Sequence, residues 1–266
     1  MATPGKQLRV ATVGDIHYGR NTHGSLQPLF QHVNERADVF VICGDLTDHG
    51  VPDEAHALAR ELTVHVKVPI ITVLGNHDYH SGKQGELMKI FADAGVRVLD
   101  GDSVEVRGVS FAGVKGFGGG FGRHTLEPWG EDTIKQFVHE AIDEALKLET
   151  ALARSHTPSR IAVLHYAPIQ ATVEGEPPAI FPFLGSSRLE EPLNRYPVTA
   201  VVHGHAHHGA PEGRTSKGVP VYNVSLSLLR QHFGDRPPVR FLEVPVGEEG
   251  AAAERQPSGD GQTIRA

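Results

Sequence analysis

Five short apolar runs, each followed by polar or ionisable residues, constrain the fold of this chain more than any other feature. The runs cover residues 8–14, 38–44, 68–75, 160–164 and 198–202. Continuous apolar runs of this length are typical of strands buried on both faces, which occur in sheets that helices cover. Amphipathic stretches predict such helices at residues 52–66, 83–95 and 131–154. The alternation of strands and helices therefore predicts an α/β fold.

The later runs have a different character. Residues 96–114 have the pattern of a meander of short strands, as do residues 219–225 and 239–246. We therefore expect a mixed rather than a purely parallel sheet system. Residues 113–130 and 172–187 lack periodicity, and long loops inside a compact domain usually serve a function, so we interpret both as substrate-side loops.

The first of these loops is rich in glycine but lacks the Lys-Ser/Thr of a phosphate-binding loop. We expect it to form a mobile wall of the substrate cleft. Three of its aromatic residues could stack on a base or another aromatic group: Phe117, Phe121 and Trp129.

The composition limits the classes of protein. The 266 residues carry a formal net charge of −7, which argues against a protein that mainly grips nucleic acid. One cysteine excludes an internal disulfide, and no run approaches the length of a membrane span. We expect a single domain at 1–246, a disordered tail at 247–266 and a cytoplasmic location, with no membrane partner; homo-oligomer formation stays open.

Residues that can bind metal follow every one of the five strand runs. They are Asp15, His17, Asp45, Asn76, His77, His165, His205 and His207. Ligands bind at the carboxyl ends of strands in α/β sheets, so we expect these side chains to converge. Mixed nitrogen and oxygen donors suit Mn, Fe or Zn better than Ca. Of the two other histidines in the last cluster, we expect His203 to pack behind the site and His208 to lie at its rim.

The motifs GDIH, GDLTDHG, GNHD and GHAH, with a strand-end histidine between the last two, resemble the calcineurin-like metallophosphoesterase superfamily over about residues 8–225. The resemblance implies a four-layer α/β/β/α sandwich of two mixed β-sheets. It also implies a dinuclear metal site at the carboxyl ends of the strands.

Carried over by position, the resemblance assigns a role to each motif residue. It places one ion on Asp15, His17 and His207 and the other on Asn76, His165 and His205, with Asp45 bridging both. A hydroxide that bridges the two ions would attack the phosphorus atom. His77 would protonate the leaving group or stabilise phosphoryl charge, oriented by Asp48. Asp78 is either a support for the metal-site loop or a turn residue.

The motif spelling also bears on the substrate. The phosphoprotein phosphatases have GDYVDRG, whereas this chain has His49 at the arginine position and resembles the cyclic-nucleotide and small phosphodiesterase branch. We therefore expect a small, nucleotide-like phosphodiester as substrate. The candidate substrate contacts are His49, Tyr79, His80, Arg123, His124 and His208, together with Arg20 and His23.

Three alternatives stay open. Two keep the fold and change the substrate: a phosphomonoesterase, and a pyrophosphatase acting on nucleotide or sugar-lipid diphosphates. The third is a scaffold that has lost catalysis, although all seven predicted ligand positions are present.

Overall fold

The predicted strand runs are divided between two β-sheets in the structure, a computed structural model that describes residues 6–19 and 22–246. The first sheet has the order β11-β1-β2-β3-β4. Its strands are β1 (Gln7–Val13), β2 (Val39–Cys43), β3 (Ile70–Val73), β4 (Arg97–Val98) and β11 (Arg240–Pro245). Strands β1 to β4 run parallel, and β11 pairs antiparallel with β1.

The second sheet has the order β5-β6-β7-β8-β10-β9. Its strands are β5 (Asp102–Val106), β6 (Val109–Gly113), β7 (Ser159–Val163), β8 (Ala200–His203), β9 (Glu212–Arg214) and β10 (Pro220–Asn223). The four central strands are parallel, and both edge strands are antiparallel to their neighbours. The sheet system is thus mixed, as the sequence predicts.

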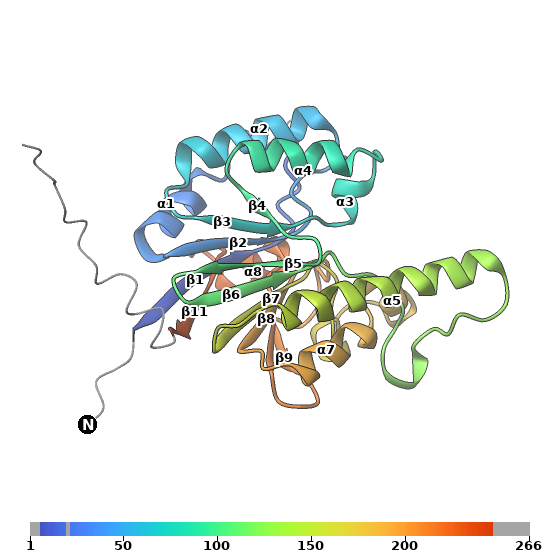
Figure 1. Cartoon of the computed structure of the whole chain (residues 1–266). Coiled ribbons are helices and arrows are strands. Elements are labelled where there is room, and N and C mark those ends of the chain that lie inside the picture. Colours follow the sequence, from blue (N-terminus) through green and yellow to red (C-terminus); the bar gives the residue numbers. More distant parts are fainter. Residues whose placement is uncertain (1–5, 20–21, 247–266) are drawn as a thin grey trace, which may run out of the picture.

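Helices cover the outer face of each sheet, so the fold is the predicted four-layer α/β/β/α sandwich (Figure 1). Over the first sheet lie α1 (Gln27–Arg36), α2 (Pro52–His65) and α4 (Gln84–Asp93). Over the second lie α5 (Asp132–Ala153) and α7 (Glu190–Arg195). The other helices are α3 (Asn76–Tyr79), α6 (Phe181–Leu184), α8 (Leu226–Phe233), η1 (Gly122–His124), η2 (Gln170–Thr172), η3 (Pro178–Ile180) and η4 (Ser187–Leu189).

The main core lies between the two sheets. Phe111 and Val163 of the second sheet share one buried cluster with Val41 of the first. Their neighbours Ala112 and Ala162 belong to a second cluster, which packs against residues of α5. Successive side chains of a strand point to opposite faces, so β6, β7 and β8 each contribute to both clusters. This double burial explains why the central strands are continuously apolar.

One sequence prediction about the strands is wrong. Residues 96–114 do not form a meander: β4 joins the first sheet parallel to β3, while β5 and β6 form a hairpin in the second. Strands β10 and β11 likewise lie in different sheets, with β10 parallel to β8. Consecutive short strands have the same sequence pattern whether they pair with each other or join different sheets. The alternation of apolar and polar residues along a strand does not specify which strand it pairs with.

The predicted stacking role of Phe121 is also wrong, because this side chain is 4% exposed and packs in a small core with Ala167 and Leu184. Trp129 of the same segment is 85% exposed. Phe117 packs against Phe137, with ring centroids 4.9 Å apart. The loop is therefore anchored by its first aromatic residues. The predicted tail at 247–266 lies outside the described residues.

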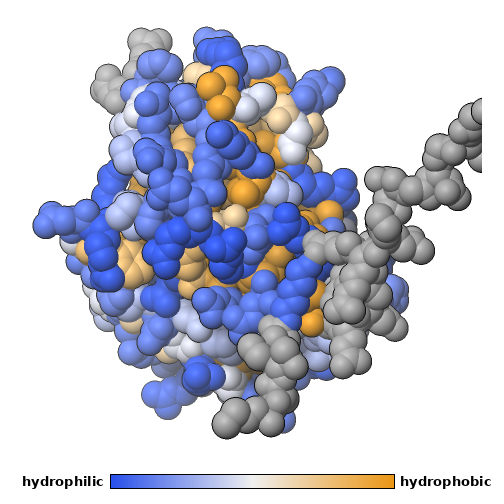
Figure 2. Space-filling model, turned by 90° about the vertical axis from the view of Figure 1, so that its left-hand side faces the viewer, coloured by the Kyte–Doolittle hydropathy of each residue, from blue (hydrophilic) through white to orange (hydrophobic). Residues whose placement is uncertain are grey.

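The surface seen in Figure 2 is largely hydrophilic, with hydrophobic residues in small areas between polar ones. Within the described ranges, no helix combines the length and the apolar character that crossing a membrane requires.

The structure predicts a severe effect of truncation at Phe40, which is fully buried in β2 and packs edge-on against Phe30 of α1 at 6.3 Å between ring centroids. Phe40→Ala should lower the free energy of unfolding by about 3–5 kcal/mol, because it removes buried contacts and leaves a cavity. Urea denaturation would measure the change. Val64→Ala, at a position 69% exposed, is the control and should change stability by less than about 0.5 kcal/mol. Equal losses of unfolding free energy in both variants would contradict the burial of Phe40.

Candidate metal centre

The carboxyl ends of five strands from both sheets meet at one edge of the sandwich. The segments after β1, β2 and β3 bring Asp15, Asp45 and Asn76 from the first sheet. The segments after β7 and β8 bring His165 and His205 from the second. Hydrogen bonds join the two groups of segments: His205 N–H donates to Asp15 Oδ1 at 2.9 Å, and His165 Nδ1 lies 2.9 Å from Cys43 O.

Four predicted ligands have a backbone conformation that is rare for residues other than glycine. The φ angles are 57° for Asp15, 46° for His17, 48° for Asp45 and 68° for His205. Among the described residues, Arg107 is the one other non-glycine residue in this region. Such residues cost free energy and persist where the surrounding structure holds them, frequently at functional sites. Strands β1, β2 and β8 are therefore each followed by a sharp turn that carries a predicted ligand.

The first donor group consists of Asp15, His17 and His207, whose ligand atoms all lie within 4.8 Å of one another. His207 Nε2 is 3.1 Å from Asp15 Oδ1 and 3.5 Å from His17 Nε2. The second group consists of Asp45, His165 and His205, also within 4.8 Å. A third group, His17, Asp45 and His77, meets the same distance and links the first two, so the structure brings the donors of both sides together.

Asp45 belongs to the second group and also faces the first. Its Oδ2 is 3.7 Å from His17 Nε2, and its Oδ1 is 3.4 Å from His165 Nε2. Asn76 lies next to the second donor group, because its Oδ1 is 2.8 Å from His165 Nε2. The two oxygens of one carboxylate thus face the two donor groups, an arrangement in which a single residue can contact two ions.

The pKa shifts and the buried carboxylates at this edge favour the binding of cations. Burial lowers the pKa of His17 to about 4 and holds that of His165 well below its usual range, so both imidazoles can bind metal in neutral form. Burial and the charge of Asp15 raise the pKa of Asp45. For Asp15, burial raises the pKa, but the hydrogen bond from His207 and the nearby imidazoles outweigh it and lower the pKa overall. In the described ranges, the basic groups paired with these two carboxylates are histidines. Divalent ions would supply the positive charge that such buried carboxylates need.

Two glycines in the motifs are required by close approach. A Cβ at Gly75, before Asn76, would overlap Asp45 Oδ1, and a Cβ at Gly204, before His205, would overlap Asp15 Oδ2. The carboxylates therefore occupy the space that a side chain would fill, which explains the glycine of GNHD and of GHAH.

Asp78 supports the site from behind and is not a simple turn residue. It is fully buried and accepts hydrogen bonds from Thr47 Oγ1 at 2.6 Å and from Thr47 N at 2.9 Å. It also accepts from Leu46 N at 3.2 Å and from Gly75 N at 2.8 Å. One carboxylate thus ties the segment after β2 to the segment after β3, which sets the positions of Asp45 and Asn76.

His77 stands at the side of the first donor group, with its ring centroid 4.4 Å from that of His17. Its Nδ1 is 2.7 Å from the main-chain oxygen of Asp48, whereas the Asp48 carboxylate is 3.9 Å away. The orienting contact therefore comes from the backbone of Asp48 rather than from the side chain that the sequence singles out. A Nδ1–H donor to that carbonyl leaves Nε2 available for the substrate.

The candidate substrate contacts are scattered. The Nδ1 atom of His49 lies 3.3 Å from the Asp48 carboxylate. Tyr79 packs beneath Lys115 Nζ at 5.3 Å, and the main chain of His208 donates to Glu176 at 2.7 Å.

The other candidates lie on exposed segments. His80 is exposed, and Arg123 and His124 form the exposed turn η1 and contact each other at 3.3 Å. His23 pairs with Glu61 at 2.8 Å, and Arg20 lies outside the described residues.

His203 packs behind the site, as predicted. It is fully buried, with Nδ1 2.8 Å from Gly204 O and Nε2 2.8 Å from Thr172 Oγ1.

Sequence analysis did not identify Tyr166 and Phe183. The Tyr166 ring lies 4.4 Å from the His205 ring, and Phe183 O lies 3.1 Å from His205 Nε2. Tyr166 directly follows the predicted ligand His165, and Phe183 belongs to the predicted substrate-side loop at 172–187. Their places in the sequence could therefore have identified both as neighbours of the site.

Comparison with known proteins agrees with this geometry. The family described as Calcineurin-like phosphoesterase matches residues 8–209. The SbcD component of the nuclease SbcCD from Staphylococcus epidermidis is 30% identical over 124 residues, which are 39% of this chain and 33% of that protein. The uncharacterized protein YpbG of Bacillus subtilis is 29% identical over 154 residues, 57% of this chain and 53% of that protein. The chain therefore spans about a third to a half of the length of these relatives.

Two solved structures share the fold. The phosphopantetheinyl hydrolase PptH of Mycobacterium tuberculosis superposes with a TM-score of 0.66 at 14% identity, covering 90% of this chain and 96% of that one. A putative 5′-nucleotidase of Staphylococcus aureus gives a TM-score of 0.52 at 13% identity, covering 82% of this chain and 48% of that one. The family match over residues 8–209, the sandwich fold and the two donor groups lead to one conclusion: the chain belongs to the calcineurin-like phosphoesterase family, whose members hydrolyse phosphoesters with metal ions.

Proposed function

We propose that this protein is a phosphodiesterase that hydrolyses small phosphodiesters at a dinuclear metal site. The observation that carries the proposal is the position of Asp45, whose two oxygens face the donor groups on either side. Asp15, His17 and His207 would hold one ion, and Asn76, His165 and His205 the other. Transition-metal ions such as Mn, Fe or Zn suit this mixture of carboxylate, imidazole and amide donors.

When bound, such ions would polarise the phosphoryl oxygens and lower the pKa of water to about 7, which provides a nucleophile at neutral pH. The residues of the chain do the rest. Asp15 and Asp45 supply the negative charge that retains the cations, and the left-handed turns hold both side chains inward. His77, held through Nδ1 by Asp48 O, can present Nε2–H to the leaving oxygen when it is protonated.

The basic side chains around the site support a diester rather than a monoester substrate. A monoester dianion needs additional cationic contacts. Lys115, the buried lysine on this side, directs its Nζ to Gly116 O at 2.8 Å and toward the rings of Tyr79 and Phe117. Arg123 is exposed and bonds to its neighbour His124. A diester carries one negative charge, which the bound ions can neutralise.

A single experiment tests the proposal. Metal content of the purified protein would be measured together with rates on bis-(p-nitrophenyl) phosphate and p-nitrophenyl phosphate, with Mn²⁺ added. We expect about two ions per chain and a higher kcat/KM for the diester. Preference for the monoester would favour a phosphomonoesterase, and failure to bind metal would refute the dinuclear site.

Removal of Asp45 should abolish metal binding on both sides. Asp45→Ala deletes the carboxylate that faces both donor groups, so we expect loss of both metal equivalents and of nearly all activity, measured by elemental analysis and turnover. Asp93→Ala is the matched control, since Asp93 ends α4 on the exposed surface. A folded Asp45→Ala protein that retains two ions would rule out a bridging role.

His77→Ala should separate metal binding from turnover. We expect unchanged metal content and a loss of about 10²- to 10⁴-fold in kcat on a diester with a poor leaving group, because a general acid is lost. The loss should be smaller with p-nitrophenolate, which leaves without a proton. His139→Ala, on an exposed face of α5, serves as the control. Loss of metal together with turnover would instead make His77 a ligand.

A further inference from the structure

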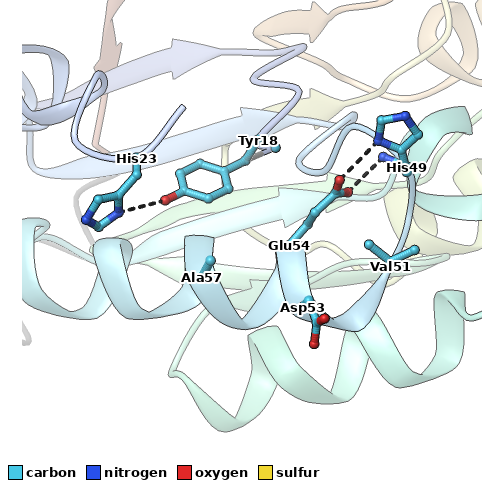
Figure 3. Close-up of a pocket in the computed structure, with 8 residues that line it drawn as sticks. Tyr18, His23, His49, Val51, Asp53, Glu54 and Ala57 are labelled. Atoms are coloured by element: carbon cyan, nitrogen blue, oxygen red, sulfur yellow. Dashed lines mark hydrogen bonds and ion pairs between the residues drawn. The ribbon is translucent and has the colours of Figure 1, made fainter. Parts of the chain in front are cut away.

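The two sides of the metal-binding site differ in the side chains that a substrate would meet. On the side of the first donor group, near α2, polar side chains are paired with one another: His49 with Glu54, and Tyr18 with His23 (Figure 3). On the side of the second donor group, aromatic side chains follow one another from the His205 ring outward. They are Tyr166, Phe117, Phe137 and Phe183. A planar, apolar part of a substrate would therefore find similar chemistry on the second side.

The aromatic rings on this side contact one another. The centroid of the Tyr166 ring lies 4.4 Å from that of His205 and 5.7 Å from that of Phe117. The Phe117 ring lies 4.9 Å from the Phe137 ring, which in turn lies 6.1 Å from the Phe183 ring. Aromatic pairs attract each other at such separations. We refer to Tyr166, Phe117, Phe137 and Phe183 as the aromatic wall.

Lys115 holds the inner part of the aromatic wall from behind. Its Nζ lies 4.7 Å from the centroid of the Phe117 ring and 5.4 Å from that of the Tyr166 ring, and an ammonium group is attracted to ring faces at these distances. The main-chain oxygen of Lys115 accepts hydrogen bonds from His165 N and Tyr166 N, both at 3.0 Å. The same residue thus fixes the first ring of the wall and the main chain of a predicted metal ligand.

The outer part of the aromatic wall rests on contacts between the two predicted substrate-side loops. Gly119 N–H donates to Pro182 O at 2.6 Å, and Gly120 N–H donates to Gly185 O at 2.9 Å. These two hydrogen bonds lie on either side of Phe183 in the sequence. The main chain that carries Phe183 is therefore held against the glycine-rich loop.

Phe183 is the exposed member of the aromatic wall. It is 60% exposed, whereas the next residue, Leu184, is buried. Its main-chain oxygen lies 3.1 Å from His205 Nε2, and the covalent bonds between them keep the Phe183 ring within about 6 Å of that oxygen. Single exposed apolar side chains are common on protein surfaces. This one stands beside a predicted metal ligand, where a ring joined to a bound phosphate through a short linker could reach it.

We propose that Phe183 is a specificity-determining residue that stacks on a planar aromatic substituent of the phosphodiester, an inference that rests on the proposed function. The phosphate would stay at the donor groups, and the aromatic substituent would lie against the exposed Phe183 ring. Aromatic pairs in offset-stacked or edge-on arrangements attract each other beyond the effect of the area that they bury. The preferred substrates would then be phosphodiesters whose substituents carry an aromatic ring, rather than aliphatic ones.

Two symmetrical phosphodiesters test this preference: dibenzyl phosphate and bis(cyclohexylmethyl) phosphate, which differ in the saturation of their rings. Because both substituents of each ester are alike, the result does not depend on which one faces the aromatic wall. Each ester is used as a competitive inhibitor of bis-(p-nitrophenyl) phosphate hydrolysis by the metal-loaded full chain. We expect the Ki of dibenzyl phosphate to be about three- to tenfold lower. A surface that is only apolar would favour the saturated ring, which has the larger apolar area.

Three variants locate the preference at Phe183. Phe183→Leu keeps an apolar side chain without the ring, so the advantage of dibenzyl phosphate should disappear while the metal content stays unchanged. Phe183→Tyr keeps the ring and should retain the wild-type ratio of Ki values. Trp129→Leu is the matched control, because it removes an even more exposed aromatic side chain from the glycine-rich loop, and it should also retain the ratio.

The outcomes separate this inference from the proposed function. Equal Ki values, a lower Ki for the saturated ester, or a preference that Phe183→Leu retains would overturn the role of Phe183 and leave the phosphodiesterase intact. A preference that is lost in Trp129→Leu instead would assign the stacking to that residue. Hydrolysis of p-nitrophenyl phosphate but not of bis-(p-nitrophenyl) phosphate would refute the proposed function, and the role of Phe183 in selecting diesters with it.

Discussion

The burial of two neighbouring carboxylates, Asp15 and Asp45, is the constraint on which the rest of this structure depends. They are 4% and 1% exposed, and the charge of one raises the pKa of the other. Burial of like charges is costly unless hydrogen bonds and cations compensate. The main chain provides part of the compensation: His205 N–H donates to Asp15 at 2.9 Å, and His77 N–H donates to Asp45 at 2.8 Å. Metal ions would provide the remainder.

This requirement shapes the segments around the site. The carboxylates are reached by backbone that turns sharply, with left-handed φ at the ligands and glycine where a Cβ would overlap an oxygen. Asp78 then fixes two of these segments to each other through main-chain donors of Leu46, Thr47 and Gly75. The strain at the site is held by hydrogen bonds within the same edge of the fold, so the geometry is set before any ligand arrives.

Both donor groups take residues from both sheets. Asp15 and His17 follow β1, whereas His207 follows β8; Asp45 follows β2, whereas His165 follows β7. Packing between the sheets therefore sets the separation of donors within each group.

The sequence by itself determined which residues end the strands and therefore which chemistry is available, because apolar runs and the polar residues after them are local patterns. It identified the buried strands β1, β2, β3, β7 and β8, the helices α2, α4 and α5, and the seven residues now found at one edge. The tertiary structure decided what local patterns do not contain. It placed β4 and the β5–β6 hairpin in different sheets, buried Phe121, and made a backbone carbonyl rather than the Asp48 carboxylate the partner of His77. Each of these depends on contacts between residues far apart in the chain, and such contacts exist only after the two sheets have packed.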